Sequence, residues 1–248
     1  MCPLVFDCKM GLVSVMKVRL VSYTPHPDEV CNLAAGTCVS EGAPEYDGNL
    51  RALKGALASG HESVAEHASF TFFIEGVSRA LSHQLVRHRI ASYSQQSQRY
   101  VKMENFDYVT PVSIRDSEME CDTRIITDPD YSSLWNVYHE LMCEIADIYE
   151  KFVNAGIPEE DARYILPNAC CTNITVTMNA RELRHFFRLR CCSRAQWEIR
   201  QLAYIMLNYC KEKAPVLFED AGPSCAATGR CPEGKKSCGE PMKRKVKE

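Results

Sequence analysis

The residues most able to do chemistry lie between Arg87 and Tyr100. This stretch holds three arginines, one histidine, three serines and three glutamines, and only two aliphatic residues. The arginines repel one another unless an anion lies among them, and a guanidinium group binds phosphate or carboxylate through two parallel hydrogen bonds. A solvated basic loop is the alternative. The absence of lysine and the position just after a helical pattern favour a site for a phosphorylated ligand with further polar groups.

A second chemical candidate is Arg190, at the end of a predicted helix that Asn179 begins as N-cap. Leu183, Phe186 and Phe187 form the apolar stripe of this helix, and Arg190 occupies the next position on it. An arginine on that side needs an anionic or polar partner, unless it extends from the helix end into water. Three further arginines are predicted on the opposite face: Arg181, Arg184 and Arg188.

Two histidine- or cysteine-containing segments could suggest metal binding. His61 and His67 are six residues apart, which places them about 240° apart on a helix rather than on one face. A capped helix start with a surface histidine is the simpler interpretation. Cys225, Cys231 and Cys238 could ligate zinc, but their spacing differs from the usual paired ligands, and a flexible tail is the alternative. We predict no metal site.

The elements that must position these residues follow from periodicity and from helix-start and turn residues. The sequence predicts strands over residues 13–23, 68–75, 105–110 and 172–178, with Gly76 ending the second strand. It predicts helices over residues 27–35, 49–57, 78–87, 131–155 and 196–213, and a helix from Pro158 that contains Arg163. The helix over 131–155 is predicted to be amphipathic, with its aromatic residues in the core, because apolar residues recur at helical spacing: Leu134, Val137, Tyr138, Leu141, Ile145 and Tyr149. Residues 42–48 and 113–129 are predicted to be mainly loop.

Bulk properties exclude some classes of protein. The chain of 248 residues is long enough for one large domain or two small ones. Its net charge of −3 gives no general attraction to nucleic acid, and no apolar run approaches the roughly 18 residues of a membrane span. The first 15 residues do not resemble an export signal, so we expect a cytoplasmic protein whose 14 cysteines are mostly reduced, many of them small buried hydrophobes.

The arginine-rich stretch resembles the signature of the flavin-dependent thymidylate synthases. Arg87-His88-Arg89 is followed by Ser97 and then Arg99. Supporting segments occur in the family's order from about Lys17 to Phe218, among them Gly60-His61-Glu62 and Gln196-Trp197-Glu198-Ile199. The resemblance implies an α+β fold with a mixed sheet, long flanking helices and the thymidylate synthase-complementing topology. We predict this domain over residues 16–220, an N-terminal extension over 1–15, and a Cys/Gly-rich basic tail over 221–248.

The resemblance also implies the reaction. FAD reduced by NADPH would take the methylene group of methylenetetrahydrofolate, which passes to dUMP and becomes the methyl group of dTMP. The cofactor supplies the difficult chemistry, and the protein binds and orients. The family forms homotetramers with active sites shared between subunits. Nucleic acid and membranes are not expected partners.

The resemblance assigns site residues individually. For dUMP they are Gln84, Arg87, Gln95, Gln96, Ser97, Gln98, Arg99, Arg163 and Arg190, with Arg190 and Ser97 next to the reacting base as catalytic residues. For FAD they are His61, Ser63, Arg87, His88, Arg89, Gln95, Asn179, Arg181 and His185. Gln95 stands where some family members have glutamate, so it cannot act as a base, and His185 stands where some have asparagine.

Three other interpretations remain open at the level of sequence. A nucleic-acid-binding module could use the arginine-rich helices, although the acidic net charge disfavours it. Another kind of flavoenzyme would share the cofactor but not the product. Cys170 and Cys171 could suggest a cysteine nucleophile, but no motif surrounds them and we predict core residues.

Overall fold

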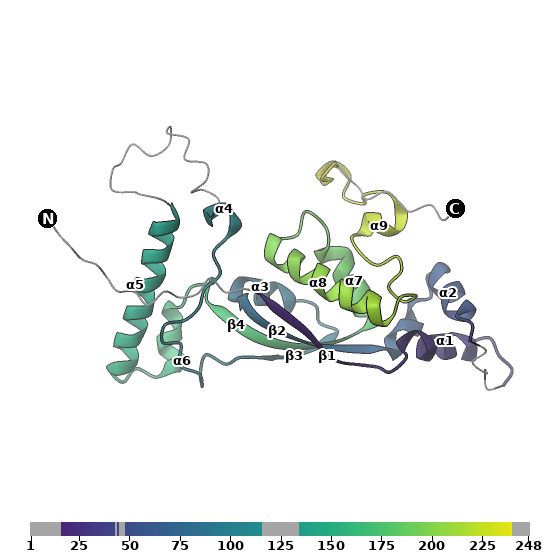
Figure 1. Cartoon of the computed structure of the whole chain (residues 1–248), viewed down its shortest axis with the longest axis horizontal. Coiled ribbons are helices and arrows are strands. Elements are labelled where there is room, and N and C mark those ends of the chain that lie inside the picture. The colour runs from purple at the N-terminus through teal and green to yellow at the C-terminus, as the bar shows by residue number, and fades with distance from the viewer. Residues whose placement is uncertain (1–15, 43, 45–47, 116–133, 240–248) are drawn as a thin grey trace. The chain divides into compact units, whose positions relative to one another are not determined.

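The computed structural model describes residues 16–42, 44, 48–115 and 134–239 (Figure 1). Its strands are β1 (Lys17–Tyr23), β2 (Ser69–Ser78), β3 (Ala91–Gln95) and β4 (Cys171–Asn179), in the sheet order β1-β2-β4-β3. Thr71 is hydrogen-bonded to Thr177, and the amide of Gly76 to the Asn173 side chain, so β2 and β4 run in opposite directions. The predicted α+β class is confirmed, but the sheet is antiparallel rather than mixed.

The helices follow in the order of the chain. They are α1 (Pro27–Thr37), α2 (Arg51–Ala58), η1 (Glu62–His67), α3 (Arg79–Leu85), α4 (Val112–Arg115), α5 (Leu134–Asn154), α6 (Glu159–Ala162), η3 (Arg163–Ile165), α7 (Ala180–Arg190), α8 (Trp197–Lys213), α9 (Ser224–Thr228) and η4 (Gly234–Lys236). Among the described helices, none is long and apolar enough to cross a lipid bilayer.

The chain divides into two compact units. Among the described residues, the α5 unit comprises Met16, Glu75–Ser82, 95–115 and 134–173. The α7 unit comprises the described residues of 17–74, His83–Ser94 and 174–239.

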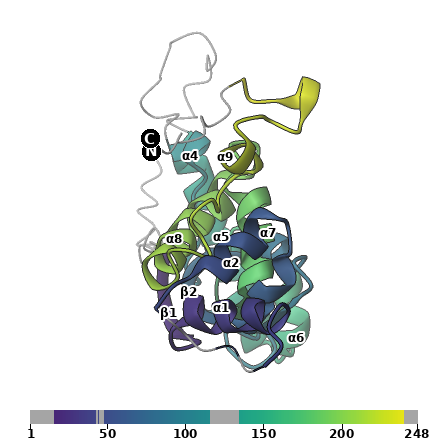
Figure 2. The same cartoon turned by 90° about the vertical axis from the view of Figure 1, so that its right-hand side faces the viewer.

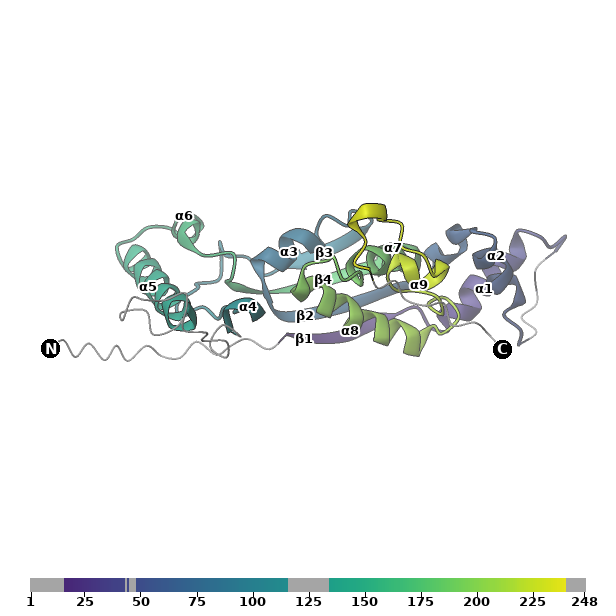
Figure 3. The same ribbon diagram turned by 90° about the horizontal axis from the view of Figure 1, so that it is seen from above.

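In the α7 unit, α7 and α8 pack on the apolar face of the strands. Side chains alternate along β2, where Phe70, Phe72 and Ile74 are fully buried, as the sequence predicts. Phe70 and Phe187 both make edge contacts with Phe218, which follows α8. Figure 3 shows α8 running along β1, and the Tyr209 hydroxyl donates to the Val18 carbonyl at 3.3 Å.

At one end of the α7 unit, α1 and α2 lie side by side (Figure 2). The buried Asn32 side chain accepts a hydrogen bond from the Leu53 amide at 3.0 Å. Asp28, in the first turn of α1, accepts from the amides of Val216 and Leu217 at 2.9 Å each. These contacts fix the segment after α8 against α1.

The α5 unit has its own core, in which α5 packs on the segment before α4. Tyr149 is fully buried, and its hydroxyl accepts from the Met103 amide at 3.2 Å. Tyr138 donates to the Val109 carbonyl at 2.9 Å. These aromatic residues are core residues, as predicted. Cys170 is fully buried in the same core, as predicted, and burial raises the pKa of its thiol to about 11.

Several element boundaries differ from the sequence prediction. β2 continues past Gly76 to Ser78, because the Asn173 side chain supplies a partner for the Gly76 amide at 3.2 Å. Residues 105–110 form only an isolated bridge between Tyr108 and Cys170 rather than a strand. The helix predicted over 78–87 ends at Leu85, and the prediction missed β3 because Ala91–Gln95 is rich in serine and glutamine. The tail contains α9, although residues 240–248 lie outside the described part.

Burial on two helices differs from what helical periodicity alone suggests. The apolar stripe of α5 is not wholly in the core: Leu134, Val137 and Leu141 are 50%, 36% and 49% exposed. Arg184 is not on an exposed face of α7 but is only 4% exposed. The segment around Leu217 covers it, which helical periodicity alone does not reveal. The cysteine prediction was better, since Cys31, Cys170, Cys191 and Cys210 are buried.

Candidate functional site

The turn that carries Arg87-His88-Arg89 is fixed by Tyr93 of β3. The Tyr93 hydroxyl lies 2.8 Å from the carbonyl oxygens of both Leu85 and His88. The His88 amide donates to the Leu85 carbonyl at 3.1 Å. Arg87 and Arg89 remain exposed, whereas His88 is only 5% exposed. The motif therefore presents two arginines to solvent and places the histidine in the core.

His88 connects α7 residues on both sides of its ring. Its Nδ1 lies 3.3 Å from a carboxylate oxygen of Glu182, and its Nε2 lies 3.1 Å from Nε of Arg190. Phe186 and His185 pack against the ring. Burial, with Arg190 and His185 nearby, lowers the pKa of His88 from 6.5 to about 4, so the ring is neutral at pH 7.

The polar partner that the sequence required for Arg190 is thus His88. Arg190 is half-buried, and burial together with the charge of Arg87 lowers its pKa. An arginine remains protonated in spite of such a shift. The site therefore holds a charged guanidinium group beside a neutral imidazole, with Arg87 in the same electrostatic environment.

A cavity of about 450 Å³ lies between η1 and the first turns of α7. Its lining residues are Glu62, Glu66, Ile90, Asn179, Arg181, Glu182, His185 and Arg188. Three of the residues assigned to FAD by resemblance are among them: Asn179, Arg181 and His185. Asn179 also caps α7, as predicted, by accepting from the Glu182 amide at 2.9 Å.

The other residues assigned to FAD do not line this cavity. His61 precedes η1 and Ser63 lies within it; both are exposed, next to the cavity residue Glu62. Exposed Arg87 and Arg89 flank the buried His88. The structure thus gathers three of these residues at one cavity and leaves the others in neighbouring segments.

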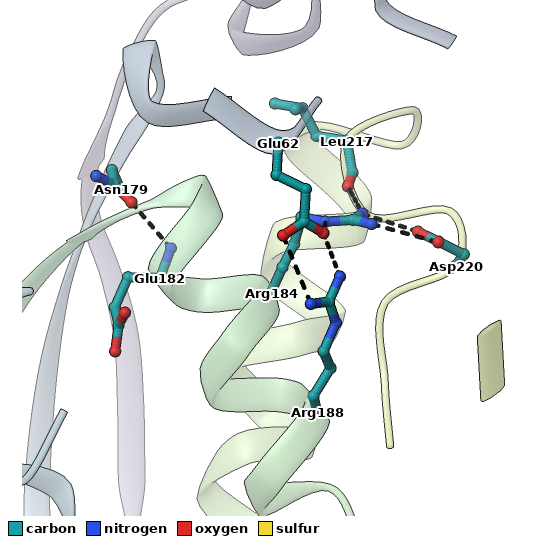
Figure 4. Close-up of polar contacts among 7 residues, drawn as sticks. All are labelled: Glu62, Asn179, Glu182, Arg184, Arg188, Leu217 and Asp220. Carbon is teal, nitrogen blue, oxygen red and sulfur yellow. Dashed lines mark hydrogen bonds and ion pairs between the residues drawn. The ribbon is translucent and has the colours of Figure 1, made fainter. Parts of the chain in front are cut away.

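The arginines around the cavity form ion pairs with carboxylates. Arg181 pairs with Glu66, and Arg188 pairs with Glu62. Buried Arg184 donates to the Asp220 carboxylate at 2.8 and 3.3 Å and also bonds to the Leu217 carbonyl, while its Nε lies 3.5 Å from Glu62. Figure 4 shows the contacts of Arg184 and Arg188, which join η1, α7 and the segment after α8. They hold η1, and with it His61 and Ser63, against α7.

The α5 unit holds the other part of the arginine-rich stretch. Gln95 donates to the hydroxyls of Ser82 and Thr172 at 3.0 and 3.2 Å, so its amide is held within the fold. The backbone N–H of Gln96 donates to the backbone carbonyl of Asn173 at 2.9 Å. The side-chain amide of buried Gln98 donates to the Cys170 sulfur at 3.7 Å. Ser97 is half-buried, and its hydroxyl accepts from the Arg99 amide at 3.2 Å.

Glu160 brings Arg99 and Arg163 together. The Arg99 Nε donates to the Glu160 carboxylate at 3.0 Å, and the Arg163 Nε donates to the Glu160 carbonyl at 3.1 Å. Arg163 belongs to η3 rather than to the preceding helix. Arg79 lies in the same electrostatic environment, since burial and then the charge of Arg163 lower its pKa. Two guanidinium groups on one glutamate can also bind an anion such as phosphate.

Comparison with known proteins decides the family. The family model described as thymidylate synthase complementing protein matches residues 19–216. This chain belongs to that family. A flavin-dependent thymidylate synthase of Geobacter sulfurreducens is 51% identical over 234 residues, covering 91% of this chain and 94% of the relative. One of Clostridium tetani is 46% identical over 93% of this chain and 96% of the relative, and one of Thermococcus onnurineus is 44% identical over 88% and 90%. The predicted resemblance is confirmed.

The carboxylates around the cavity of this thymidylate synthase complementing protein were not predicted from the sequence. Glu62, Glu66 and Glu182 line the cavity, and Asp220 holds Arg184. The strongest sequence signal for Glu182 was its place three residues after the N-cap Asn179, which describes a helix start and not a histidine partner. Among the described residues there is no cluster of histidine, cysteine and acidic side chains suited to a metal ion.

Proposed function

We propose that this chain converts dUMP to dTMP as a flavin-dependent thymidylate synthase. The observation that carries the proposal is identity of 42–51% with relatives of that name over most of both chains. The carbon donor is methylenetetrahydrofolate, and the reductant is NADPH acting through FAD. FAD supplies the hydride chemistry when bound, and the residues of the chain bind and orient.

FAD is proposed to bind at the cavity of the α7 unit. Arg181 and Arg188 provide cationic groups for its diphosphate, and Asn179 and His185 provide neutral hydrogen-bonding groups. The cavity holds no Gly-rich phosphate loop, so the cofactor would rely on side chains. His61, Ser63, Arg87, Arg89 and Gln95 remain predicted FAD contacts. For His88 the burial and the Arg190 contact favour a supporting role.

The dUMP phosphate is proposed to bind Arg99 and Arg163. Both guanidinium groups are gathered at Glu160, and the Arg99–Glu160 pair is half exposed, so an exchange of the carboxylate for a phosphate costs little. Gln84, Arg87, Gln95, Gln96, Ser97 and Gln98 are further proposed contacts. Arg190 would stabilise negative charge on the uracil ring, and Ser97 would lie beside the reacting carbon.

The homotetramer and the cytoplasmic location are also proposals, as are the domain boundaries at residues 15 and 220. The exposed apolar side chains of α5 support an association between copies, because a helix in a monomer normally covers such a stripe. A net charge of −3 supports the absence of nucleic acid as a partner.

The visible spectrum of the purified protein tests the proposed function directly. We expect flavin absorption bands that shift when dUMP is added, because the proposed reaction requires the flavin and the nucleotide to be in contact. Release of tritium from C5-labelled dUMP, dependent on methylenetetrahydrofolate and NADPH, should then accompany dTMP formation. A colourless protein that takes up neither FAD nor dUMP would refute the proposal. Flavin bands without dTMP formation would instead indicate another flavoenzyme.

A further inference from the structure

We infer that Glu182 and His88 are positioning residues that orient the guanidinium group of Arg190 toward the nucleotide base. The inference rests on the proposed function, because it assigns Arg190 to the uracil ring. It concerns three hydrogen-bonded side chains from two segments of the α7 unit. Glu182 and Arg190 lie on α7, and His88 lies in the turn before β3.

In the hydrogen-bonded row Glu182–His88–Arg190, the donor and acceptor role of each group determines that of its neighbour. A carboxylate only accepts, so the proton of the neutral imidazole lies on Nδ1, 3.3 Å from Glu182. The Nε2 atom then carries the lone pair and accepts from the Nε–H of Arg190 at 3.1 Å. An arginine can only donate, so the opposite tautomer would place two N–H groups against each other. Glu182 therefore selects the tautomer that can hold Arg190.

Burial makes this selection effective. His88 and Glu182 are only 5% and 6% exposed, so water cannot readily replace either partner. The three cations earlier on α7 do not compete for Glu182, because Arg181 pairs with Glu66, Arg188 with Glu62 and Arg184 with Asp220. Figure 4 shows the Glu182 side chain directed away from the Glu62–Arg188 pair.

The contact with His88 leaves the two terminal nitrogens of Arg190 available to bind a ligand. Only its Nε is used by His88, so the four N–H groups on the two terminal nitrogens can donate to a ligand. Holding Nε fixes the plane of the guanidinium group, and this orientation is what a developing charge on a planar uracil ring requires. A loss of the His88 contact would leave the charge in place but free to rotate.

Two isosteric variants of His88 separate this role from simple packing. In His88→Gln the amide oxygen lies near the position of Nε2 and can still accept from Arg190. In His88→Asn the amide lies near Nδ1, so it retains a group for Glu182 but offers nothing to Arg190. We expect His88→Gln to keep kcat within about threefold of wild type. We expect His88→Asn to lose kcat about tenfold or more, the equivalent of one buried hydrogen bond to a charged group.

Glu182→Gln tests the selection of the tautomer without changing the shape of the side chain. Because its amide can donate to Nδ1, it allows the tautomer that opposes Arg190, and a related exchange in serine proteases is known to act in this way. We expect a fall in kcat similar to that of His88→Asn, measured at saturating FAD because Glu182 also lines the cavity proposed for the cofactor. Exposed His83 and Glu144 supply the matched controls His83→Asn and Glu144→Gln, which should behave as wild type.

The deciding measurement is the affinity for dUMP. It is determined by calorimetry on the FAD-loaded enzyme, in the wild-type background and in an Arg190→Ala background. If His88 acts through Arg190, His88→Asn weakens dUMP binding in the wild-type background but not in an Arg190→Ala background. Equal effects in both backgrounds, or equal losses in His88→Asn and His88→Gln, would overturn the inference. A wild-type enzyme that neither binds dUMP nor forms dTMP would instead refute the proposed function on which the inference rests.

Discussion

At the scale of single residues, the chemistry of this site depends on which groups are charged. His88 has a pKa lowered to about 4 by burial, Arg190 and His185, against 6.5 in the unfolded chain. Between these values the unfolded chain binds more protons, so the contribution of His88 to stability is complete above pH 6.5 and is lost as the pH falls toward 4. We expect His88→Gln to show a smaller loss of unfolding free energy between pH 7 and pH 4 than wild type, as measured by urea denaturation. Parallel pH profiles for the two proteins would contradict this.

Arg184 gives a second residue-scale prediction. Its side chain is only 4% exposed, and its guanidinium group donates hydrogen bonds to both the Asp220 carboxylate and the Leu217 carbonyl. Arg184→Met should therefore lower the unfolding free energy by about 2 kcal/mol, since these charge-assisted bonds are lost while the packing volume is retained. Arg181→Met, at a half-exposed ion pair, is the control and should change stability by less than about 1 kcal/mol. Chemical denaturation measures both; equal effects would show that burial of Arg184 is not decisive.

At the scale of elements, the start of α8 depends on an unusual N-cap. The Gln196 side chain accepts from the amides of Glu198 and Ile199 at 3.1 Å each, which satisfies two unpaired donors of the first turn. Gln196→Ala should lower stability by about 1 kcal/mol, as other cap deletions do, and leave FAD and dUMP binding unchanged. Gln201→Ala, at an exposed position of the same helix, should have almost no effect. Thermal melting and ligand titration of both variants give the comparison.

The elements that were predicted well are those with a regular apolar period. The alternation of Phe70, Phe72 and Ile74 identified β2, and Asn179 identified the start of α7. The missed features depend on contacts between residues far apart in the chain. His88 meets Glu182 across 94 positions, and Arg184 is covered by Leu217 and Asp220 from a different segment. β3 lacks the apolar alternation of a strand and is recognised only through its neighbour in the sheet.

The candidate site was predicted unevenly for a similar reason. A short motif with arginine and histidine can be matched to a family by its order, and this order identified Arg87, His88 and Arg89. The motif does not reveal which way each side chain points. The resemblance assigns all three residues to FAD, whereas the structure buries His88 against Arg190. Glu62 of η1 was missed because an acidic residue at a helix start looks like an ordinary dipole partner.

At the scale of the whole molecule, the exposed stripe of α5 makes the proposed homotetramer testable. Leu134, Val137 and Leu141 are 50%, 36% and 49% exposed, and their spacing places them along one side of the helix. We expect wild type to have a mass four times that of the 28.0-kDa chain in light scattering. Leu141→Lys puts a charge into a buried apolar contact between copies, so it should shift the protein to smaller species. Glu140→Lys, at the adjacent exposed position, should leave the mass unchanged. A tetramer that survives Leu134→Lys and Leu141→Lys together would place the interface elsewhere, whereas a loss of both mass and activity would indicate that the active site needs residues from more than one copy.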